Sequence, residues 1–404
     1  MSEIKVNSIK GVGASTAAIS IDNSSGSASA NLTAVNSVVM PNGGFLSNKN
    51  IIINGAMQCA QYGASDSTTN GNGTVDRFQL IRSGVDENPT QEQVSVSSGT
   101  TPYTLGFRNA FKVTNGNQTS VGTSDYITMR YKIEAQDIAN SGWNYVSSSS
   151  YITFSFWVKS SVAQNFYGYF KTSDGTAQMY SYETGSLTAN TWTKVTKTIA
   201  GNSNLQFDND NGIGLEIYLS QFWGTDRTGS VSLDAWRSYN GAARTPDFTS
   251  TWYTTDNATF EITGVQLEVG NVATDFEHRS YGQELALCKR YFQTSFTSNP
   301  STTNTSNNGV VLHGGGRTGD TTSFIGGSYV QLSPAMRAAP TVTTFDLAVA
   351  RNTNKCHRHT YGFTGSNDQP VTITDVNINS FVVRSDSGNS ANGLVYHWKC
   401  EGEL

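Results

Sequence analysis

Apolar and polar residues alternate along much of this chain, with the period of two that is typical of a half-buried β-strand. The stretches 126–133, 151–158 and 260–269 show it most regularly, and the last slips by one residue at Gly264, where a β-bulge would fit. Further strand patterns lie at 51–53, 166–170, 192–199 and 214–219, with turns such as Asp174-Gly175 between several of them. Many short strands without intervening helices predict a β-sandwich over residues 49–279.

A short helix is predicted directly after this sandwich, at 281–292. Ser280 and Gln283 have the spacing of a capping box. One helical face would carry Tyr281, Leu285, Cys288 and Phe292. The residues that follow are nearly all Ser, Thr and Asn, so we interpret 280–308 as a junction helix and a linker.

Strand patterns resume after the linker, at 310–312, 328–332, 341–345, 371–376, 380–383 and 393–399. They predict a second, smaller β-sandwich over residues 309–404. We interpret it as a distal, receptor-binding domain.

The first 48 residues contain short alternating segments around Ile19, Ile21, Ala28 and Ala30, separated by glycine-rich turns. One such segment has too little apolar surface to fold alone. Three copies wound around a common axis would bury this narrow stripe, so we interpret residues 1–48 as an intertwined stalk of a homotrimer. The alternative is a disordered tail that is ordered only by its partner.

Several motifs resemble one known family. Residues 265–270, Phe276-Glu277-His278-Arg279 and residues 285–291 closely resemble a segment of tail-fibre and virion-fibre proteins from cyanophages and related marine tailed bacteriophages. The segments 4–11 and 50–58 resemble the same proteins, so the resemblance covers residues 1–292. It implies a jelly roll like that of carbohydrate-binding modules at 49–279. It also implies attachment to phage tail or capsid proteins through the N-terminus and a place in the virion.

The composition and charge of the chain limit the classes of partner that it is expected to bind. Charged residues are 14% of the chain, against about 25% in ordinary soluble proteins. Aromatic residues are 11%, which suits sheets and not disorder. The net charge is −5 without a Lys/Arg cluster, so nucleic acid is not an expected partner. No apolar run approaches about 18 residues, so we expect no membrane insertion, and synthesis in a host cytoplasm without a signal peptide.

Exposed aromatic rings are the expected ligand-binding groups, because the C–H face of a sugar stacks on them. The candidates are Trp252, Tyr253, Tyr361, Phe363 and Trp398. A sandwich of this size also needs an aromatic core, so for any one of them a place in the core is the alternative.

Metal candidates come from two short motifs. The oxygen-rich turn containing Asp208 and Asp210 could hold a structural calcium, or could be a plain hairpin turn. His357 and His359 would point to the same side of a strand and could hold a metal at the tip of a trimer; ordinary solvated or core histidines are the alternative. No other cofactor is expected. The cysteines are read as buried or free thiols, with a Cys356–Cys400 disulfide left open.

No motif places a Ser or Cys nucleophile with a base. Acidic residues that are close in sequence do not show how far apart their carboxylates would lie in a groove, so they do not predict a glycosidase pair. We therefore expect a non-enzymatic tail fibre that binds host surface polysaccharide or lipopolysaccharide. The alternatives are a head or tail decoration or cement fibre without a host ligand, and a polysaccharide-degrading tailspike.

Overall fold

The computed structural model describes residues 49–297, 300–314, 326–359, 365–385 and 393–404, together with short strands before residue 31. It has two compact units, residues 1–48 and 49–404. Both contain antiparallel sheets, so the prediction of a mainly β protein is confirmed. Among the described residues, no helix has the length and apolar character needed to cross a membrane.

The N-terminal unit contains a three-stranded antiparallel sheet in the order β1-β2-β3. Its strands are β1 (Ser8–Ile9), β2 (Ile19–Ile21) and β3 (Ala28–Ala30). Ile19 is opposite Ile9 on one side and Ala30 on the other. These are the short strands expected around Ile19 and Ala28. The rest of the predicted stalk lies outside the described residues.

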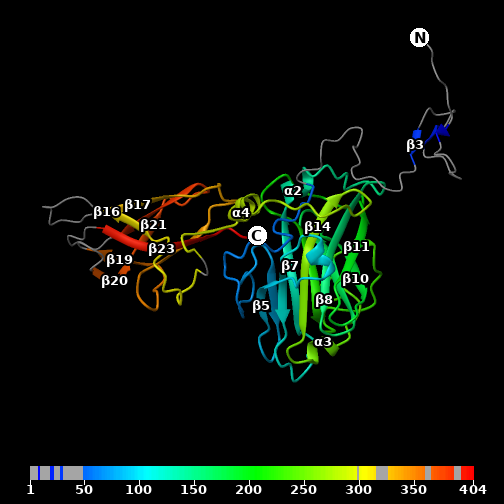
Figure 1. Ribbon diagram of the computed structural model, residues 1–404, viewed down its shortest axis with the longest axis horizontal. Coiled ribbons are helices and arrows are strands. Elements are labelled where there is room, and N and C mark those ends of the chain that lie inside the picture. The colour runs from blue at the N-terminus through cyan, green and yellow to red at the C-terminus, as the bar shows by residue number, and fades with distance from the viewer. Residues whose placement is uncertain are drawn as a thin grey trace, which may run out of the picture. The chain divides into compact units, whose positions relative to one another are not determined.

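The second unit begins with a β-sandwich made of a six-stranded sheet, β13-β10-β9-β12-β7-β4, and a five-stranded sheet, β11-β8-β14-β6-β5 (Figure 1). The strands are β4 (Gln79–Ser83), β5 (Thr90–Ser95), β6 (Asn109–Thr114), β7 (Tyr126–Glu134), β8 (Tyr151–Ser160), β9 (Asn165–Thr172), β10 (Gln178–Ser186), β11 (Thr193–Ala200), β12 (Ile213–Trp223), β13 (Trp236–Ser238) and β14 (Thr259–Val269). The alternating residues of both sheets share one core. The predicted sandwich is therefore present.

The slip at Gly264 is a real irregularity of β14. The register against β8 shifts between Thr263 and Gln266, and Gly264 has a φ of +62°. A Cβ at this position would lie 2.6 Å from the ring of Phe107. Glycine is needed here both for the backbone angle and for space. The slip keeps Val265 and Leu267 in the same core as Ile262.

The run Ile51-Ile52-Ile53 forms no strand and leads into a turn that begins at Ile53, so its prediction as a strand was wrong. The amide oxygen of Asn50 accepts hydrogen bonds from the backbone N of Ile52 and of Leu267, both at 3.0 Å. A side chain that takes the nearby backbone donor folds the chain back on itself. Burial of Ile52 and Ile53, not a strand, explains the apolar run.

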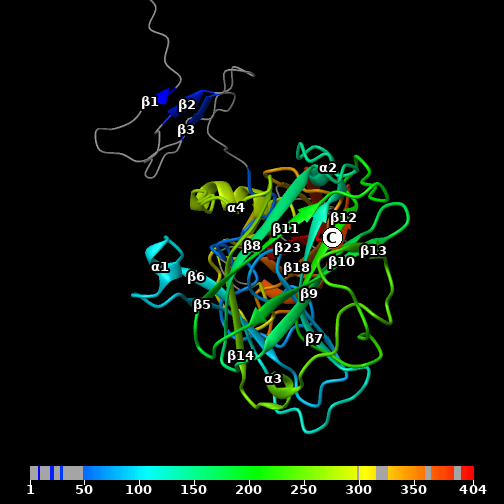
Figure 2. The same cartoon turned by 90° about the vertical axis from the view of Figure 1, so that its right-hand side faces the viewer.

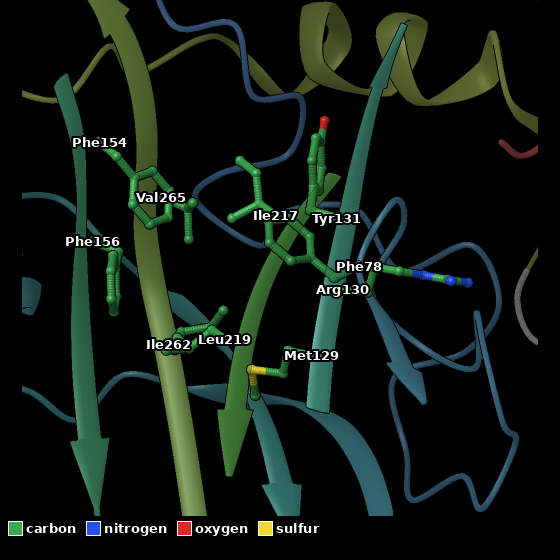
Figure 3. A pocket seen from close by; sticks show the side chains of 10 residues that line it. All are labelled: Phe78, Met129, Arg130, Tyr131, Phe154, Phe156, Ile217, Leu219, Ile262 and Val265. Atoms are coloured by element: carbon green, nitrogen blue, oxygen red, sulfur yellow. The ribbon is translucent and has the colours of Figure 1, made fainter. Parts of the chain in front are cut away.

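The core of the sandwich is closely packed. A cavity of about 20 Å³ lies between β7, β8, β12 and β14, and Figure 3 shows it among apolar side chains, with Arg130 pointing away. It is lined by residues such as Met129, Phe154, Leu219 and Ile262. A space of this size holds no more than one water molecule, so it is a packing defect and not a ligand site.

Short helices lie in the connections of this sandwich. They are α1 (Thr101–Thr104), α2 (Ala135–Ala139), α3 (Thr251–Thr254) and α4 (Tyr281–Lys289). Helices α2 and α4 lie at one end, and α3 lies at the opposite end (Figures 1 and 2). The capping box of α4 is confirmed, since Ser280 Oγ accepts from Gln283 N and Gln283 Oε1 accepts from Ser280 N.

Helix α4 differs from its prediction in length and in its buried face. It ends at Lys289, and Phe292 begins the next strand. Tyr281 is 57% exposed, whereas Glu284 is buried. Glu284 tolerates burial because its carboxylate accepts a 2.5 Å hydrogen bond from Asn54 N and pairs with Arg279.

The C-terminal strands form two further antiparallel sheets with a core of their own. The longest strand, β23 (Gly393–Glu401), pairs with β15 (Phe292–Thr294), β16 (Val311–Gly314), β18 (Thr341–Phe345) and β19 (Lys355–His359), and β19 pairs with β20 (Gly365–Pro370). The other sheet has the order β17-β22-β21, from β17 (Gly326–Gln331), β22 (Ser380–Ser385) and β21 (Thr372–Thr374). The predicted strands at 341–345 and 393–399 are confirmed.

Cys356 and Cys400 are buried in this core without a disulfide between them. The register places His357 opposite Val395, so Cys356 lies opposite Tyr396. Cys400 is four residues further along β23, roughly 13 Å at 3.3 Å per residue. The strand pairing therefore leaves these cysteines too far apart for a disulfide.

The stability of this region should depend on pH through His397. A neutral ring protonated on Nε2 donates to Ser306 O at 3.0 Å and accepts at Nδ1 from Ser295 Oγ at 3.0 Å. Burial, helped by the charge of Arg351, lowers the pKa of His397 to about 4. The unfolded chain, with an ordinary pKa of about 6.5, binds the proton more tightly. Stability is therefore complete above about pH 6.5 and falls by roughly 2–3 kcal/mol on going down to pH 4.

Urea unfolding of the wild type and of His397→Gln between pH 4 and 7 measures this dependence. In His397→Gln, the free energy of unfolding should no longer fall between pH 6.5 and 4 by the amount that His397 contributes. The control is His313→Gln, which replaces a half-buried histidine on β16 and should keep the pH dependence of the wild type. Equal slopes in all of these proteins would contradict the role of His397.

Candidate functional site

An open hollow of about 440 Å³ lies beside the start of β6, between the turn after α1 and the segment that leads into α4. Ligand sites in proteins commonly have volumes of about 300–1,000 Å³. The hollow is lined by Ala56, Gln58, Gly106, Arg108, Asn109, His278, Arg279 and Tyr281. Most of these side chains are polar, and their positive charges come from arginine.

One wall of the hollow is built around a glycine. Gly106 has a φ of +98°, and a Cβ on it would lie 3.1 Å from the ring of His278. The absence of a side chain lets His278 Nε2 lie 2.9 Å from Leu105 O. The His278 ring also packs against Phe107 and Phe276, with centroids 5.1 and 4.9 Å apart. The exposed imidazole is thus held in a defined position.

Arg108 contributes a second exposed group. Its guanidinium lies 4.0 Å from the ring centroid of Tyr103, and Nη1 donates to the carbonyl oxygens of Tyr103 and Phe107, both at 2.9 Å. Stacking and these bonds limit the rotamers of the side chain. An exposed guanidinium held in this way can bind an oxygen-rich ligand without much further loss of entropy.

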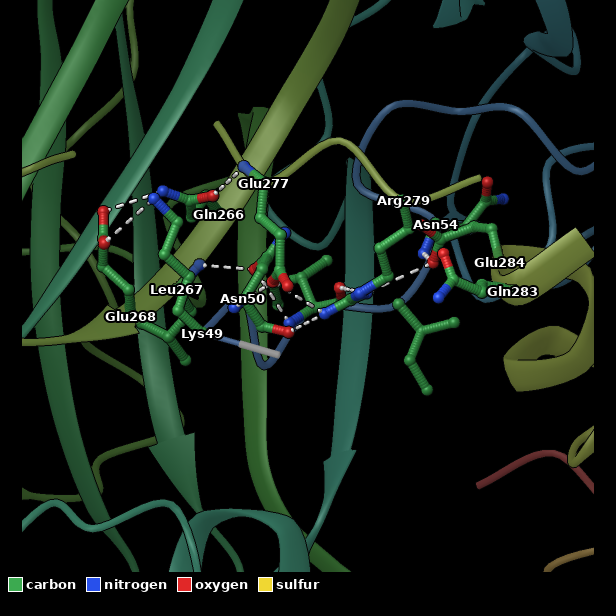
Figure 4. Close-up of polar contacts among 12 residues, drawn as sticks. Lys49, Asn50, Asn54, Gln266, Leu267, Glu268, Glu277, Arg279, Gln283 and Glu284 are labelled. Carbon is green, nitrogen blue, oxygen red and sulfur yellow. Dashed lines mark hydrogen bonds and ion pairs between the residues drawn. The ribbon is translucent and has the colours of Figure 1, made fainter. Parts of the chain in front are cut away.

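Arg279 holds the segment between β14 and α4 in place. It is 9% exposed and pairs with Glu277 at 3.3 Å and Glu284 at 3.4 Å, while donating to Ile52 O at 3.1 Å and to Asn50 O. Figure 4 shows this guanidinium between the start of the sandwich and α4. Two carboxylates compensate its charge, so its main effect is to fix the position of the segment that carries His278 and Tyr281.

The same segment is tied to the sandwich by further polar contacts (Figure 4). Gln266 Oε1 accepts from Glu277 N at 2.9 Å, and Glu268 accepts from Thr274 N at 2.9 Å. Lys49 donates to Thr274 and to Asp275 O. These bonds replace a regular strand ladder and hold an irregular segment in a single conformation.

Tyr281 supplies an exposed aromatic ring at the first turn of α4. Half-buried amides also line the hollow at Gln58 and Asn109, and an amide carries both donors and an acceptor. An aromatic ring, amides and a guanidinium form a combination that can bind a hydroxylated ring, through stacking on its C–H face and hydrogen bonds to its hydroxyls. The cationic groups favour ligands that also carry a carboxylate or a sulfate.

The predicted ligand residues Trp252 and Tyr253 are core residues, which corrects their assignment. Both are 0% exposed. Trp252 Nε1 donates to Thr259 O at 3.1 Å, and the Tyr253 hydroxyl donates to Asp125 at 3.0 Å. The Tyr253 ring stacks on Phe222, with centroids 4.2 Å apart. Neither ring offers a face to a ligand.

Trp398 is also buried, at 8% exposed, and packs edge-on against Phe381 with centroids 5.4 Å apart. Its assignment as a ligand residue is therefore corrected as well. Tyr361 and Phe363 lie outside the described residues.

The metal candidates are separate features of the fold. Asp208 and Asp210 lie in an exposed bend before β12, where Asp210 accepts from Gly212 N at 2.8 Å and Asp208 N donates to Asp174 at 3.0 Å. His357 is 6% exposed, and its Nδ1 lies 2.8 Å from Asn367 Oδ1. The side chain of His359 lies outside the described residues. Calcium at the bend and a tip metal at the histidines stay predictions.

The residues of the hollow had no assigned role in the sequence. His278 and Arg279 belong to a motif that resembles phage fibres, and Tyr281 was predicted on one helical face with Leu285 and Cys288. Leu105 and His278 are 173 residues apart, and no periodic pattern connects them. The glycine at 106, two residues before Arg108, is a turn signal that could have drawn attention to this part of the chain.

Comparison with known protein families gives no match, and comparison with curated protein sequences gives none either. Among solved structures, the chain is similar to the enzymatically active domain of tailspike protein 4 from bacteriophage CBA120, with 13% identity over 55% of this chain and a TM-score of 0.29. The match spans 22% of that tailspike chain.

Carbohydrate-binding modules are similar over a comparable part of the chain. A module titled CBM4 matches with 13% identity over 54% of this chain and 98% of its own, at a TM-score of 0.26. A family 11 module from Clostridium thermocellum, in complex with a β-1,3-1,4-mixed-linked tetrasaccharide, also matches. The identity is 12% over 54% of this chain and 98% of the module, and the TM-score is 0.23. At such TM-scores the β-sandwich assignment rests on the sheets described above.

Proposed function

We propose that this chain is a non-enzymatic adhesion fibre of a tailed bacteriophage, and that the hollow beside β6 binds a saccharide of the host cell surface. One observation supports this most directly. An exposed tyrosine ring, amides and a fixed arginine line a space that fits a sugar residue. Proteins hold hydroxylated rings with groups of these kinds. These residues supply hydrogen-bond donors and acceptors, but they do not pair a nucleophile with a base.

The proposal places residues 1–48 at the virion, through tail or capsid proteins, and makes them the trimerisation stalk. The motifs that resemble those of phage fibres and the narrow apolar stripe predicted for the short strands support this arrangement. Three weak sites on one fibre, and several fibres on one virion, would raise avidity by roughly 10²–10⁴. Sedimentation of the full chain as a monomer at micromolar concentration would contradict the trimer.

Replacing Tyr281 by alanine should weaken saccharide binding by about tenfold, the equivalent of about 1.4 kcal/mol, because a stacking platform is lost. The free energy of unfolding should stay within about 0.5 kcal/mol of the wild type, because this side chain is 57% exposed. Binding is measured on an array of neutral and acidic oligosaccharides, with the full chain as the probe. We expect the acidic sugars to bind more tightly, because Arg108 faces the ligand.

Tyr329→Ala is the matched control, since Tyr329 is 61% exposed on β17 and outside the hollow. It should bind as the wild type does. Because Tyr329 lies in residues 309–404, a loss of binding in this variant would support the receptor-binding role expected for that domain in place of the hollow. Equal losses in both variants, or no binding to any saccharide of the array by the wild type, would overturn the assignment of the hollow.

A further inference from the structure

Three metal-binding side chains meet in the interior, next to α4. One ligand atom from each of Cys59, Asp76 and Cys288 lies within 4.8 Å of the others. The residues are 0%, 1% and 1% exposed. Their apolar surroundings include Ile53 and Tyr291. Thiols and a carboxylate grouped in this way are outside the saccharide hollow and have no part in its binding chemistry.

A single asparagine positions two of these residues. Asn54 Oδ1 accepts from Cys59 N at 2.9 Å, and Asn54 Nδ2 donates to Cys59 O at 2.9 Å and to Asp76 O at 3.0 Å. Asp76 N donates to Cys59 O at 3.1 Å. The backbone of Asn54 in turn donates to Glu284 on α4, the helix that carries Cys288. The site is thus assembled from three segments by fixed hydrogen bonds.

The Asp76 carboxylate has the outer hydrogen bonds of a metal ligand. Gln61 N donates to Oδ1 and Gln61 Nε2 to Oδ2, both at 2.7 Å. Ligating carboxylates are commonly oriented by such second contacts.

We propose that Cys59, Asp76 and Cys288 form a binding site for one thiophilic divalent cation, with Zn²⁺ as the best fit and a water molecule as the fourth ligand. Tetrahedral zinc with Zn–S bonds of about 2.3 Å and Zn–O bonds of about 2.0–2.2 Å keeps its ligand atoms roughly 3.5–3.8 Å apart. Atoms within 4.8 Å of one another reach this arrangement by small rotations. Binding breaks two S–H bonds, forms two Zn–S bonds and one Zn–O bond to the Asp76 carboxylate, and releases the two thiol protons to solvent. The ion would connect α4 to the first sandwich.

The test uses the full chain, purified with a phosphine reductant, stripped with a chelator, loaded with zinc chloride and freed of excess metal. Mass spectrometry of the metal content should find about one zinc per chain. The double variant Cys59→Ser/Cys288→Ser should hold at least about tenfold less, because serine is a poor zinc ligand. Cys400→Ser, a buried cysteine of the other core, should hold as much as the wild type.

Cobalt(II) supplies a readout that does not depend on a variant folding. The wild type loaded with cobalt should show sulfur-to-cobalt charge-transfer absorption, which reports thiolate ligation directly. Absence of this band, zinc below roughly a tenth of an equivalent in the wild type, or equal zinc in the wild type and the double variant would each overturn the proposal. None of these results bears on saccharide binding, which is tested separately by Tyr281.

Discussion

Replacing Trp252 by alanine should lower the free energy of unfolding by about 3–5 kcal/mol, the range found when a large buried aromatic is removed from a core. Trp252 is 0% exposed in the core between the sheets. Its indole also donates to Thr259 O, so the variant loses one buried hydrogen bond, while Ser161 N still donates to that carbonyl. Urea unfolding followed by circular dichroism measures the loss.

Trp192→Ala is the matched control. Trp192 is half-buried, and Lys159 Nζ lies 5.1 Å from its ring centroid. Its removal should cost about 1 kcal/mol, because much of the side chain is already in contact with water. A stable Trp252→Ala protein that has lost saccharide binding would restore Trp252 as a ligand residue and contradict its burial.

The second large effect is expected at Glu134, which is 0% exposed. Oε1 accepts from Arg290 Nε at 2.8 Å and from the Tyr291 hydroxyl at 2.6 Å, and Oε2 accepts from Arg290 Nη2 at 2.7 Å. Burial alone would raise the pKa of Glu134, but these hydrogen bonds leave it below its usual value. The carboxylate is therefore ionised and fully bonded, where the first sandwich meets the residues after α4.

Glu134→Gln removes the charge and keeps the shape, so it leaves the Arg290 guanidinium without its counter-ion. We expect a loss of about 3 kcal/mol, at the lower end of the range for breaking a buried pair, because Arg290 is 33% exposed and can regain water. Asp234→Asn is the control. Its carboxylate lies 3.2 Å from Lys197 and is 49% exposed, so the change should stay within about 1 kcal/mol. Comparable losses in both variants would contradict the structural role of Glu134.

Local patterns of this sequence predicted the regular elements well. The alternation at 126–133 and 151–158 became β7 and β8 because each residue type contacts either the core or the outer face of its own sheet. The slip at Gly264 became a bulge, and the Ser280–Gln283 spacing became a capping box. These features depend on neighbouring residues only.

Local sequence patterns did not predict the structure of a segment where a residue far away in the chain determines it. β20 is a polar strand without clear alternation, and it forms because β19 lies beside it as a partner. Ile51-Ile52-Ile53 has strand composition, but the side chain of Asn50 turns the chain. The face of a half-polar aromatic such as Tyr253 depends on a hydroxyl partner, Asp125, that is 128 residues away.

The sequence by itself determined that this is a β protein, roughly where its longer strands run, and where a helix begins after the sandwich, because side-chain alternation and capping act over a few residues. Only the tertiary structure decided which aromatic rings are buried, that Arg108 and Tyr281 line one hollow, and that Cys59 and Cys288 adjoin Asp76. Those relations are contacts between segments far apart in the chain, and the packing of the whole core selects them.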